Sequence, residues 1–466
     1  MEPGAFIAFA RGVVRPAQRG RFPATSGPVA AYRAGVPARP PITFARRCLP
    51  FLVAGVAWAQ QASPPPPAPG VRIGLDQAIQ MAQRHNHALE AARSTIVQSQ
   101  AQEVTANLRP NPVLSWDSQF IPLFDLPQFA TPGYFNNSAQ FDLGVGYTIE
   151  RGQKRQNRLQ AAKDQTTVTR SQVLDNGRTL ALSVAQQFVA VLLAQSTLEL
   201  AQQDLGSYRQ TIDISQARLN AGDMSEGDLI KIKLQLLQFQ QDLSAAKLAK
   251  VQALAALRQL IGFESVPESY DVSGTLDYQP VHANLDDYKT LAVRSRPDLA
   301  AAQQSVIAAH SQVSLAQANS KRDLGLSFNY THVGAVNSAA FFFNMEIPVF
   351  DRNQGEIART QAAVTQSDEL LREESEQVMS DVVNAYEGLH TNDEIVTLFR
   401  SGYLDQTTQS RDISEYAYQR GAASLLDFLD AERSYRANQL AYRQALAAYM
   451  VSLEQVRAAV GTRNLP

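Results

Sequence analysis

The sequence is poor in the side chains that bind metals or carry covalent chemistry. It has one cysteine, Cys48, and six histidines scattered over 466 residues. His85 and His87 are two positions apart and point to different faces of a helix, so they do not form a metal-binding pair. The sequence also lacks a nucleophile elbow, a phosphate-binding loop and paired catalytic carboxylates. We therefore expect neither an enzyme nor a bound metal or cofactor.

Lysine is absent from residues 1–59, which hold eight arginines and a single acid. Arg46 and Arg47 precede an apolar run at 49–58, and the run ends in the small-residue pattern 57–59. This order is typical of a secretory signal peptide cut after Ala59, and the run is too short to span a bilayer. A buried N-terminal helix is the alternative. The proline-rich segment that follows predicts an extended tether over 60–72.

Removal of residues 1–59 changes the balance of charge. The chain then keeps 34 of its 42 basic residues and 43 of its 44 acidic residues. This negative balance excludes a general affinity for nucleic acid. Cys48 is lost with the signal, so the mature chain has no disulfide and no thiolate site.

The sequence contains an internal repeat. Residues 222–228 and 421–427 share the pattern G-x-x-S-x-x-D at an offset of 199, and a column of mostly large apolar side chains follows each at seven-residue intervals. Alanine- and glutamine-rich helices can resemble one another by chance, but they do not share turn residues as well. The repeat predicts two copies, 73–262 and 285–461, joined by a linker at 263–284. Each copy is predicted to contain a helix, two strands, a long helix and a second hairpin helix.

Proline is missing from the stretches 152–220 and 352–420, which are each 69 residues long. A continuous helix of that length extends about 100 Å. Apolar residues recur every seven positions from Val184 to Leu219, which indicates a coiled-coil seam. The remaining surface is polar and fits a hollow, water-filled assembly better than a solid bundle. A cytosolic coiled coil is the alternative, but it leaves the predicted strands unexplained.

Four segments alternate apolar and polar residues, and we predict strands at about 113–120, 139–149, 324–331 and 341–348. A half-buried soluble sheet gives the same alternation, but the secretory signal favours strands of an outer-membrane barrel. Four strands cannot close a barrel, and an open edge is not tolerated in lipid. Other copies of the chain must therefore complete the wall.

This organisation resembles the TolC family of outer-membrane efflux ducts. The resemblance is carried by residues 109–112, 149–155 and 347–351 and by the two G-x-x-S-x-x-D turns, and the first two segments resemble the heavy-metal-efflux branch. It implies a mainly α fold with a β-barrel contribution, in which a homotrimer forms a 12-stranded barrel in outer-membrane lipid and a 12-helix periplasmic tube. It also implies a passive channel for metal ions, drugs or other small molecules. The implied partners are a periplasmic adaptor (membrane fusion) protein and an inner-membrane pump of the RND type.

The two turns are the predicted functional site. Glycine suits the left-handed end of a helix, and serine followed by an acid three residues later caps the next helix. The expected turn residues are Gly222, Ser225 and Asp228 in the first copy and Gly421, Ser424 and Asp427 in the second. In the TolC family these turns form the closed periplasmic tip to which the adaptor docks.

The resemblance also implies the gate residues. Asp427 and Asp430 lie on one helix face and match the lumen-facing acidic rings of the family, which favour cations. Tyr418 and Asp228 match residues of its closed-gate network. The arginine expected two residues after the second glycine is Ala423 in this chain, so we expect Arg420 or Arg218 to replace it.

The main alternative is a periplasmic adaptor or a coiled-coil scaffolding protein that bridges the membranes. Adaptors usually carry one helical hairpin within small β-domains. This chain has two predicted hairpins and strands suited to lipid, so we favour the channel, with the second copy lining its gate.

Overall fold

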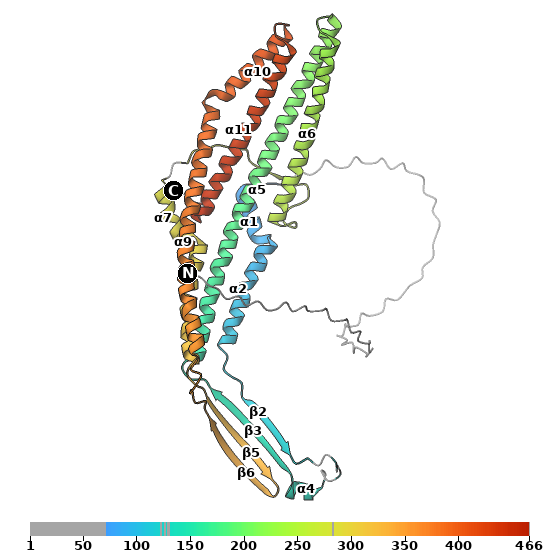
Figure 1. Cartoon of the computed structure of the whole chain (residues 1–466). Coiled ribbons are helices and arrows are strands. Elements are labelled where there is room, and N and C mark those ends of the chain that lie inside the picture. The colour runs from blue at the N-terminus through green and yellow to red at the C-terminus, as the bar shows by residue number, and fades with distance from the viewer. Residues whose placement is uncertain (1–70, 122–123, 125–126, 128–130, 282–283, 466) are drawn as a thin grey trace, which may run out of the picture. The chain divides into compact units, whose positions relative to one another are not determined.

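The computed structural model describes residues 71–465 except 122–123, 125–126, 128–130 and 282–283. The expected signal peptide and almost all of the tether lie outside the described residues. Figure 1 shows two long helical hairpins, several shorter helices and a four-stranded sheet.

The first copy of the repeat begins with two short helices, which separate where the Asn86 side chain accepts a hydrogen bond from the Leu89 N–H (3.0 Å) and caps the second helix. The elements are α1 (Leu75–His85), α2 (His87–Ala106), β2 (Val113–Gln119), α4 (Pro132–Asn137), β3 (Gln140–Ile149), α5 (Lys154–Ala221) and α6 (Glu226–Ile261). Helices α5 and α6 form the first hairpin.

The second copy repeats this order, and Pro297 starts its second helix because proline suits the first helical position. The elements are α7 (Leu285–Ser295), α8 (Pro297–Asn319), β5 (Leu324–Val333), β6 (Val336–Asn344), α9 (Gln354–Leu398), α10 (Leu404–Gln419) and α11 (Leu425–Val460). Both long hairpins begin after a residue with positive φ, Gln153 at 59° and Asn353 at 63°.

The prediction of one continuous helix over 352–420 is wrong. A π-helical turn, Phe399–Tyr403, separates α9 from α10, and Gly402 in this turn has a φ of 117°. Non-glycine residues rarely adopt this conformation, so the glycine permits the kink. The absence of proline indicated continuity, but a glycine was enough to interrupt the helix. The equivalent stretch of the first copy is the uninterrupted 68-residue α5.

The sheet has the antiparallel order β2-β3-β5-β6. Its register places apolar side chains opposite one another, as in the pairs Trp116 with Leu143 and Phe328 with Phe341. Neighbouring positions on the other face carry small or polar residues, such as Ser115 opposite Gly144. The apolar face is uncovered, with Trp116 71% and Phe341 84% exposed. The alternation predicted from the sequence is therefore present as one apolar and one polar face.

Two predicted boundaries require correction. The fourth strand is Val336–Asn344 rather than 341–348, because Gly334 (φ 55°) lets the chain reverse in a two-residue turn directly after β5. The predicted tether included residue 72, but Arg72–Ile73 forms strand β1, which pairs in parallel with β4 (Asp271–Val272) of the linker. The linker therefore packs on the first copy.

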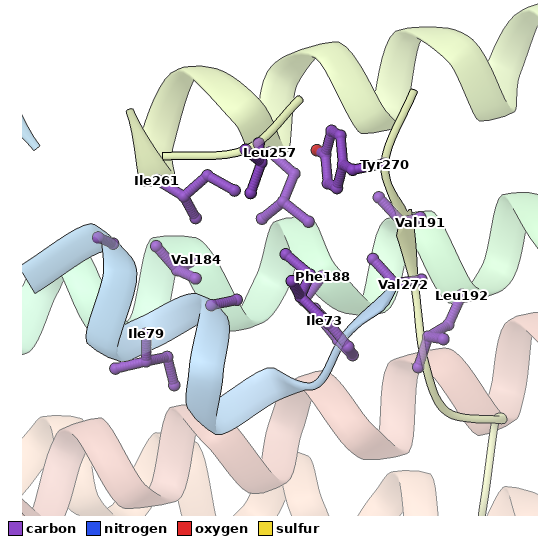
Figure 2. Close-up of a cluster of buried hydrophobic side chains, with 13 residues drawn as sticks. Ile73, Ile79, Val184, Phe188, Val191, Leu192, Leu257, Ile261, Tyr270 and Val272 are labelled. Atoms are coloured by element: carbon purple, nitrogen blue, oxygen red, sulfur yellow. The ribbon is translucent and has the colours of Figure 1, made fainter. Parts of the chain in front are cut away.

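Each copy has its own buried core between the short helices and the hairpin. In the first, side chains from α1, α5, α6 and the two short strands converge, as Figure 2 shows for Ile79, Phe188, Leu257 and Val272. In the second, α7, α9 and α11 contribute Tyr288, Val382 and Tyr449 among others. Helix α5 also contains an 18-residue stretch apolar enough to cross a membrane by length and composition, and 39% of that stretch is buried.

A glycine closes each copy at the same place. Gly262 (φ 92°) lies against the carbonyl of His85, and Gly461 (φ 84°) lies against the carbonyl of Ser295. A Cβ atom at Gly461 would be 2.9 Å from the Ser295 oxygen. The end of each hairpin is thus packed directly on the break between the two short helices.

We expect Gly461→Ala to destabilise the protein because the new methyl group meets backbone atoms and the positive φ itself costs about 1–2 kcal/mol. Gly206→Ala is the matched control, since nothing lies within 4 Å of a Cβ atom at this helical position. Thermal unfolding of the purified protein in detergent, followed by circular dichroism, should show a lower midpoint for Gly461→Ala alone. Equal midpoints for the two variants would contradict the packing.

Candidate functional site

The two predicted turns join α5 to α6 and α10 to α11. Gly222 has a φ of 85°, and the N–H of Asp223 donates to the carbonyl of Arg218 (2.9 Å). Gly421 has a φ of 78°, and the N–H of Ala422 donates to the carbonyl of Ala417 (2.8 Å). Both glycines therefore end their helices in the left-handed conformation that the sequence predicted. Only a few residues are then needed to reverse the chain.

Serine caps the helix after each turn. The Ser225 side chain accepts a hydrogen bond from the N–H of Asp228 (3.1 Å), and Ser424 accepts one from the N–H of Asp427 (3.2 Å). The Asp427 carboxylate also accepts from the N–H of Ser424 (3.3 Å), which completes a capping box. These residues therefore have a folding role, whatever their part in a gate.

Tyr418 lies in a buried cluster that holds the ends of the two hairpins together. Its ring stacks on Phe428 with centroids 5.2 Å apart, and its hydroxyl oxygen is 3.2 Å from that of Ser215 on α5. The cluster also contains Leu205, Tyr208, Ile232 and Phe239 from the first hairpin. Tyr418 is thus an anchor between the hairpins within one chain.

The structure distinguishes the two arginines expected to replace the one missing at Ala423. Arg218 of α5 donates from Nη1 to the carbonyl of Tyr418 (2.6 Å), and its guanidinium group lies 5.1 Å from the Tyr418 ring centroid. Arg420 lies over the Tyr416 ring of its own helix at 5.3 Å. Of these two arginines, only Arg218 links the two hairpins within the described residues.

Of the three predicted acidic gate residues, Asp427 and Asp430 are exposed and Asp228 is partly exposed. Asp228 forms an ion pair with Lys231 (2.9 Å), and this contact, with the hydrogen bond from Ser225, holds the pKa of the Asp228 carboxyl below its usual value. Asp430 is 3.8 Å from Arg433, and both side chains are largely exposed. No hydrogen bond joins Asp228 to Tyr418 among the described residues of one chain. A gate contact between them stays a prediction about neighbouring copies.

A partly buried group of charged side chains, which the sequence analysis did not identify, lies farther from the turns. Arg436 of α11 forms ion pairs with Asp204 of α5 (3.2 Å) and with Asp242 of α6, and its guanidinium group covers the Phe239 ring at 4.1 Å. These charges line a cavity of about 510 Å³ between the three helices. These ion pairs therefore connect the two hairpins, just as apolar packing connects them in the buried cluster around Tyr418.

Glu432 is the second buried acid in this region and is 8% exposed. Burial raises the pKa of Glu432 and outweighs the opposing effect of Arg411. Burial likewise raises the pKa of Asp204, although Arg436 opposes it. Glu432 follows the buried Phe428 by four residues and so shares its helix face, which is the signal that could have identified it from the sequence.

The sequence profile of the outer membrane efflux protein family matches residues 78–263 and 290–462. The pyoverdine export outer membrane protein OpmQ of Pseudomonas putida is 26% identical over 418 residues, which cover 83% of this chain and 86% of that protein. The cobalt-zinc-cadmium resistance protein CzcC of Cupriavidus metallidurans is 23% identical over 366 residues, which cover 78% and 84%.

Solved structures give the same fold. The crystal structure of CusC matches with a TM-score of 0.68 at 18% identity, covering 86% of this chain and 99% of that one. The open state of the MtrE outer membrane channel of Neisseria gonorrhoeae also matches with a TM-score of 0.68 at 18% identity, covering 83% and 89%. The TolC-like fold expected from the sequence is therefore confirmed.

We expect Arg218→Met to weaken the contact between the ends of the two hairpins (the tips), because it removes the hydrogen bond from the Arg218 guanidinium group to Tyr418. Such a bond is worth on the order of 1 kcal/mol, so its loss should increase the population of a state with open tips roughly five-fold. Single-channel recordings in planar bilayers should show a larger mean conductance. Arg420→Met is the matched control and should leave conductance unchanged. Equal recordings for the two variants would show that the contact between Arg218 and Tyr418 does not hold the tips.

The raised pKa values predict a dependence of stability on pH. The folded protein holds protons on Asp204 and Glu432 more tightly than the unfolded chain does, so their contribution is present at low pH and is lost as the pH rises through the raised values. Thermal unfolding measured upward from about pH 4, near the ordinary pKa values of the two carboxyls, should show this loss. Glu432→Gln should reduce the loss, whereas Glu369→Gln, at an exposed site on α9, should retain it. An unchanged pH profile in Glu432→Gln would contradict this assignment.

Proposed function

Because the chain belongs to the outer membrane efflux protein family, we propose that three copies assemble into one passive channel for exported molecules. The protein acts in the outer membrane, and its role is efflux. The copies would contribute twelve strands to a closed barrel and twelve hairpin helices to a periplasmic tube. The channel would lower no chemical barrier and bind no cofactor.

The observation that carries the proposal is the uncovered sheet. Its apolar face exposes large side chains, and its outer strands β2 and β6 each pair on one side only within the described residues. A soluble adaptor or scaffolding protein would leave such a face in water, which is unfavourable. A lipid bilayer would cover the face, and β6 and β2 of neighbouring copies would pair because they are antiparallel in this strand order.

Polar contacts join the sheet to the helices and support a continuous channel. The N–H of Arg151, just after β3, donates to the Asp323 carboxylate (3.0 Å), and Lys154 at the start of α5 forms an ion pair with the same carboxylate (2.8 Å). Arg158 of α5 pairs with Glu150 (2.8 Å). In the assembled channel, these contacts would fix the orientation of the helical tube relative to the barrel at their junction.

The tip turns are the proposed docking surface for a periplasmic adaptor, which would connect the channel to an inner-membrane pump of the RND type. Gly222, Gly421 and Ser424 are exposed at these turns. One similar protein is named for pyoverdine export and another for resistance to cobalt, zinc and cadmium. This variety of cargo supports a wide channel whose pump selects among metal ions, drugs or other small molecules.

The gate would be formed by Asp427 and Asp430 of the second copy, with Tyr418 anchoring the two hairpins within each chain and Asp228 in the contacts between neighbours. Three chains would bring six carboxylates of α11 to one constriction. A ring of carboxylates attracts cations and resists anions. The matching positions in the first copy are Asp228 and Lys231, which form an ion pair with each other. At these two positions the second copy therefore carries two acids, whereas the first carries one acid and one base.

We expect Asp427→Ala/Asp430→Ala to reduce block by divalent cations and to lower the preference for cations over anions, because the ring loses its charge. Single-channel conductance and reversal potential in a salt gradient measure both effects. Asp405→Ala is the control, because Asp405 is an exposed acid at the other end of α10.

Two outcomes would contradict the gate. Unchanged cation block and selectivity in the double variant would show that these carboxylates do not line the constriction. An equal effect of Asp405→Ala would show that the change reflects the net charge of the protein alone. Neither outcome would bear on whether three copies form the channel.

A further inference from the structure

Lysine and arginine are distributed unevenly around the sheet. Residues 110–150 and 323–351, which contain all four strands of the sheet, have no lysine or arginine. Cations nevertheless stand directly at the ends of both segments: Arg109 and Arg151 flank the first, and Arg322 and Arg352 flank the second. The chain after residue 59 has a net negative charge, yet it carries a basic residue at each passage, by which we mean a connection between a strand of the sheet and a helix.

The strand pairing brings these four passages together. Val113 at the start of β2 lies opposite Gly146 near the end of β3, and Ile149 lies opposite Leu324 at the start of β5. Gly325 in turn lies opposite Asn344 at the end of β6. All four passages are thus at the end of the sheet where the strands meet the helices (Figure 1). The segments at this end of the sheet contain eight basic and four acidic residues. The basic residues are Arg109, Arg151, Lys154, Arg155, Arg158, Lys321, Arg322 and Arg352, and the acidic residues are Glu150, Asp323, Glu346 and Asp351.

The acids do not neutralise this group. Lys154 pairs with Asp323 (2.8 Å), Arg158 with Glu150 (2.8 Å) and Arg322 with Glu346 (3.1 Å). Arg109 and Arg155 have no ion pair and no hydrogen bond from their side chains to any described residue. Arg151 and Arg352 likewise have no ion pair within the described residues, so four guanidinium groups lack an anion, those of Arg109 and Arg155 among them.

These two arginines lie beside the apolar face of the sheet. A pocket of about 280 Å³ is lined by Arg109 and Arg155, by the paired residues Glu150 and Lys154, and by Tyr147 and Ile149. Tyr147 and Ile149 continue the apolar face of β3, opposite Leu326 and Leu324. Arg151 reaches the same side, since its Nη1 is 3.6 Å from the sulfur of Met345. The pocket therefore adjoins the surface that lipid would cover.

We propose that Arg109 and Arg155, with Arg151 beside them, bind the headgroup phosphate of anionic phospholipids in the periplasmic leaflet of the outer membrane. A phosphate would supply the missing anion, and guanidinium groups suit phosphate because they donate paired hydrogen bonds. The acyl chains of the same molecule would lie on the adjoining apolar face. A free phosphate ion would satisfy the charge but leave that face uncovered. The site would also fix the depth of the barrel, because the opposite turns of the sheet have no lysine or arginine.

Lipid binding to the purified full-length protein tests the proposal. The oligomer in detergent is mixed with phosphatidylglycerol or phosphatidylethanolamine of identical acyl chains, and the bound lipids are counted by native mass spectrometry. The wild type should retain phosphatidylglycerol preferentially. Arg109→Gln/Arg155→Gln should weaken that preference by roughly five-fold for each guanidinium group removed. Arg109→Lys/Arg155→Lys should keep most of it.

Arg170→Gln/Arg209→Gln is the matched control, since both arginines are exposed on α5 and have no ion pair or hydrogen bond within the described residues. This variant should bind lipid as the wild type does. Equal binding of the two lipids by the wild type would overturn the proposal, and so would an unchanged preference in Arg109→Gln/Arg155→Gln. Displacement by inorganic phosphate would assign the site to a free anion instead. Loss of the oligomer with the lipid preference intact would assign the arginines to contacts between copies.

Discussion

A β-strand in hydrocarbon must give every backbone N–H and C=O a hydrogen-bond partner, because no water is available to replace one. The sheet of this chain satisfies that requirement internally between β2, β3, β5 and β6, but not along the outer edges of β2 and β6. Assembly with other copies follows from this constraint. The helices follow from the strands, since β3 and β6 lead directly into the long hairpins, and in the proposed assembly the barrel would set their positions around the tube.

At the far ends of the hairpins, separation is opposed by three kinds of contact. Aromatic packing around Tyr418 and the hydrogen bond from Arg218 join the tips, and the ion pairs of Arg436 join the hairpins farther along. Each of these contacts involves only a few side chains of one chain. A channel built in this way can loosen at the tips while the part in the membrane stays intact.

The sequence predicted much of this structure because the relevant signals are local. Gly222, Gly421 and the serine caps specify their turns by backbone geometry, and alternation along β3 and β5 specifies which face is apolar. The kink at Gly402 was missed because a glycine inside a long helix is usually tolerated. The pairing of β1 with β4 and the burial of Asp204 and Glu432 depend on elements far apart in the chain. The proposed gate depends on how neighbouring copies are arranged, and a single sequence does not determine that arrangement.

Crosslinking between the outer strands tests assembly through the sheet most directly. With Cys48 replaced by serine, cysteines would be introduced at Ser115 of β2 and Phe342 of β6, two positions on the same face of the sheet. We expect a short bifunctional maleimide, applied to outer-membrane fractions, to give covalent dimers and trimers only when both cysteines are present. Monomers alone, or a ladder that continues beyond the trimer, would contradict a barrel closed by three copies.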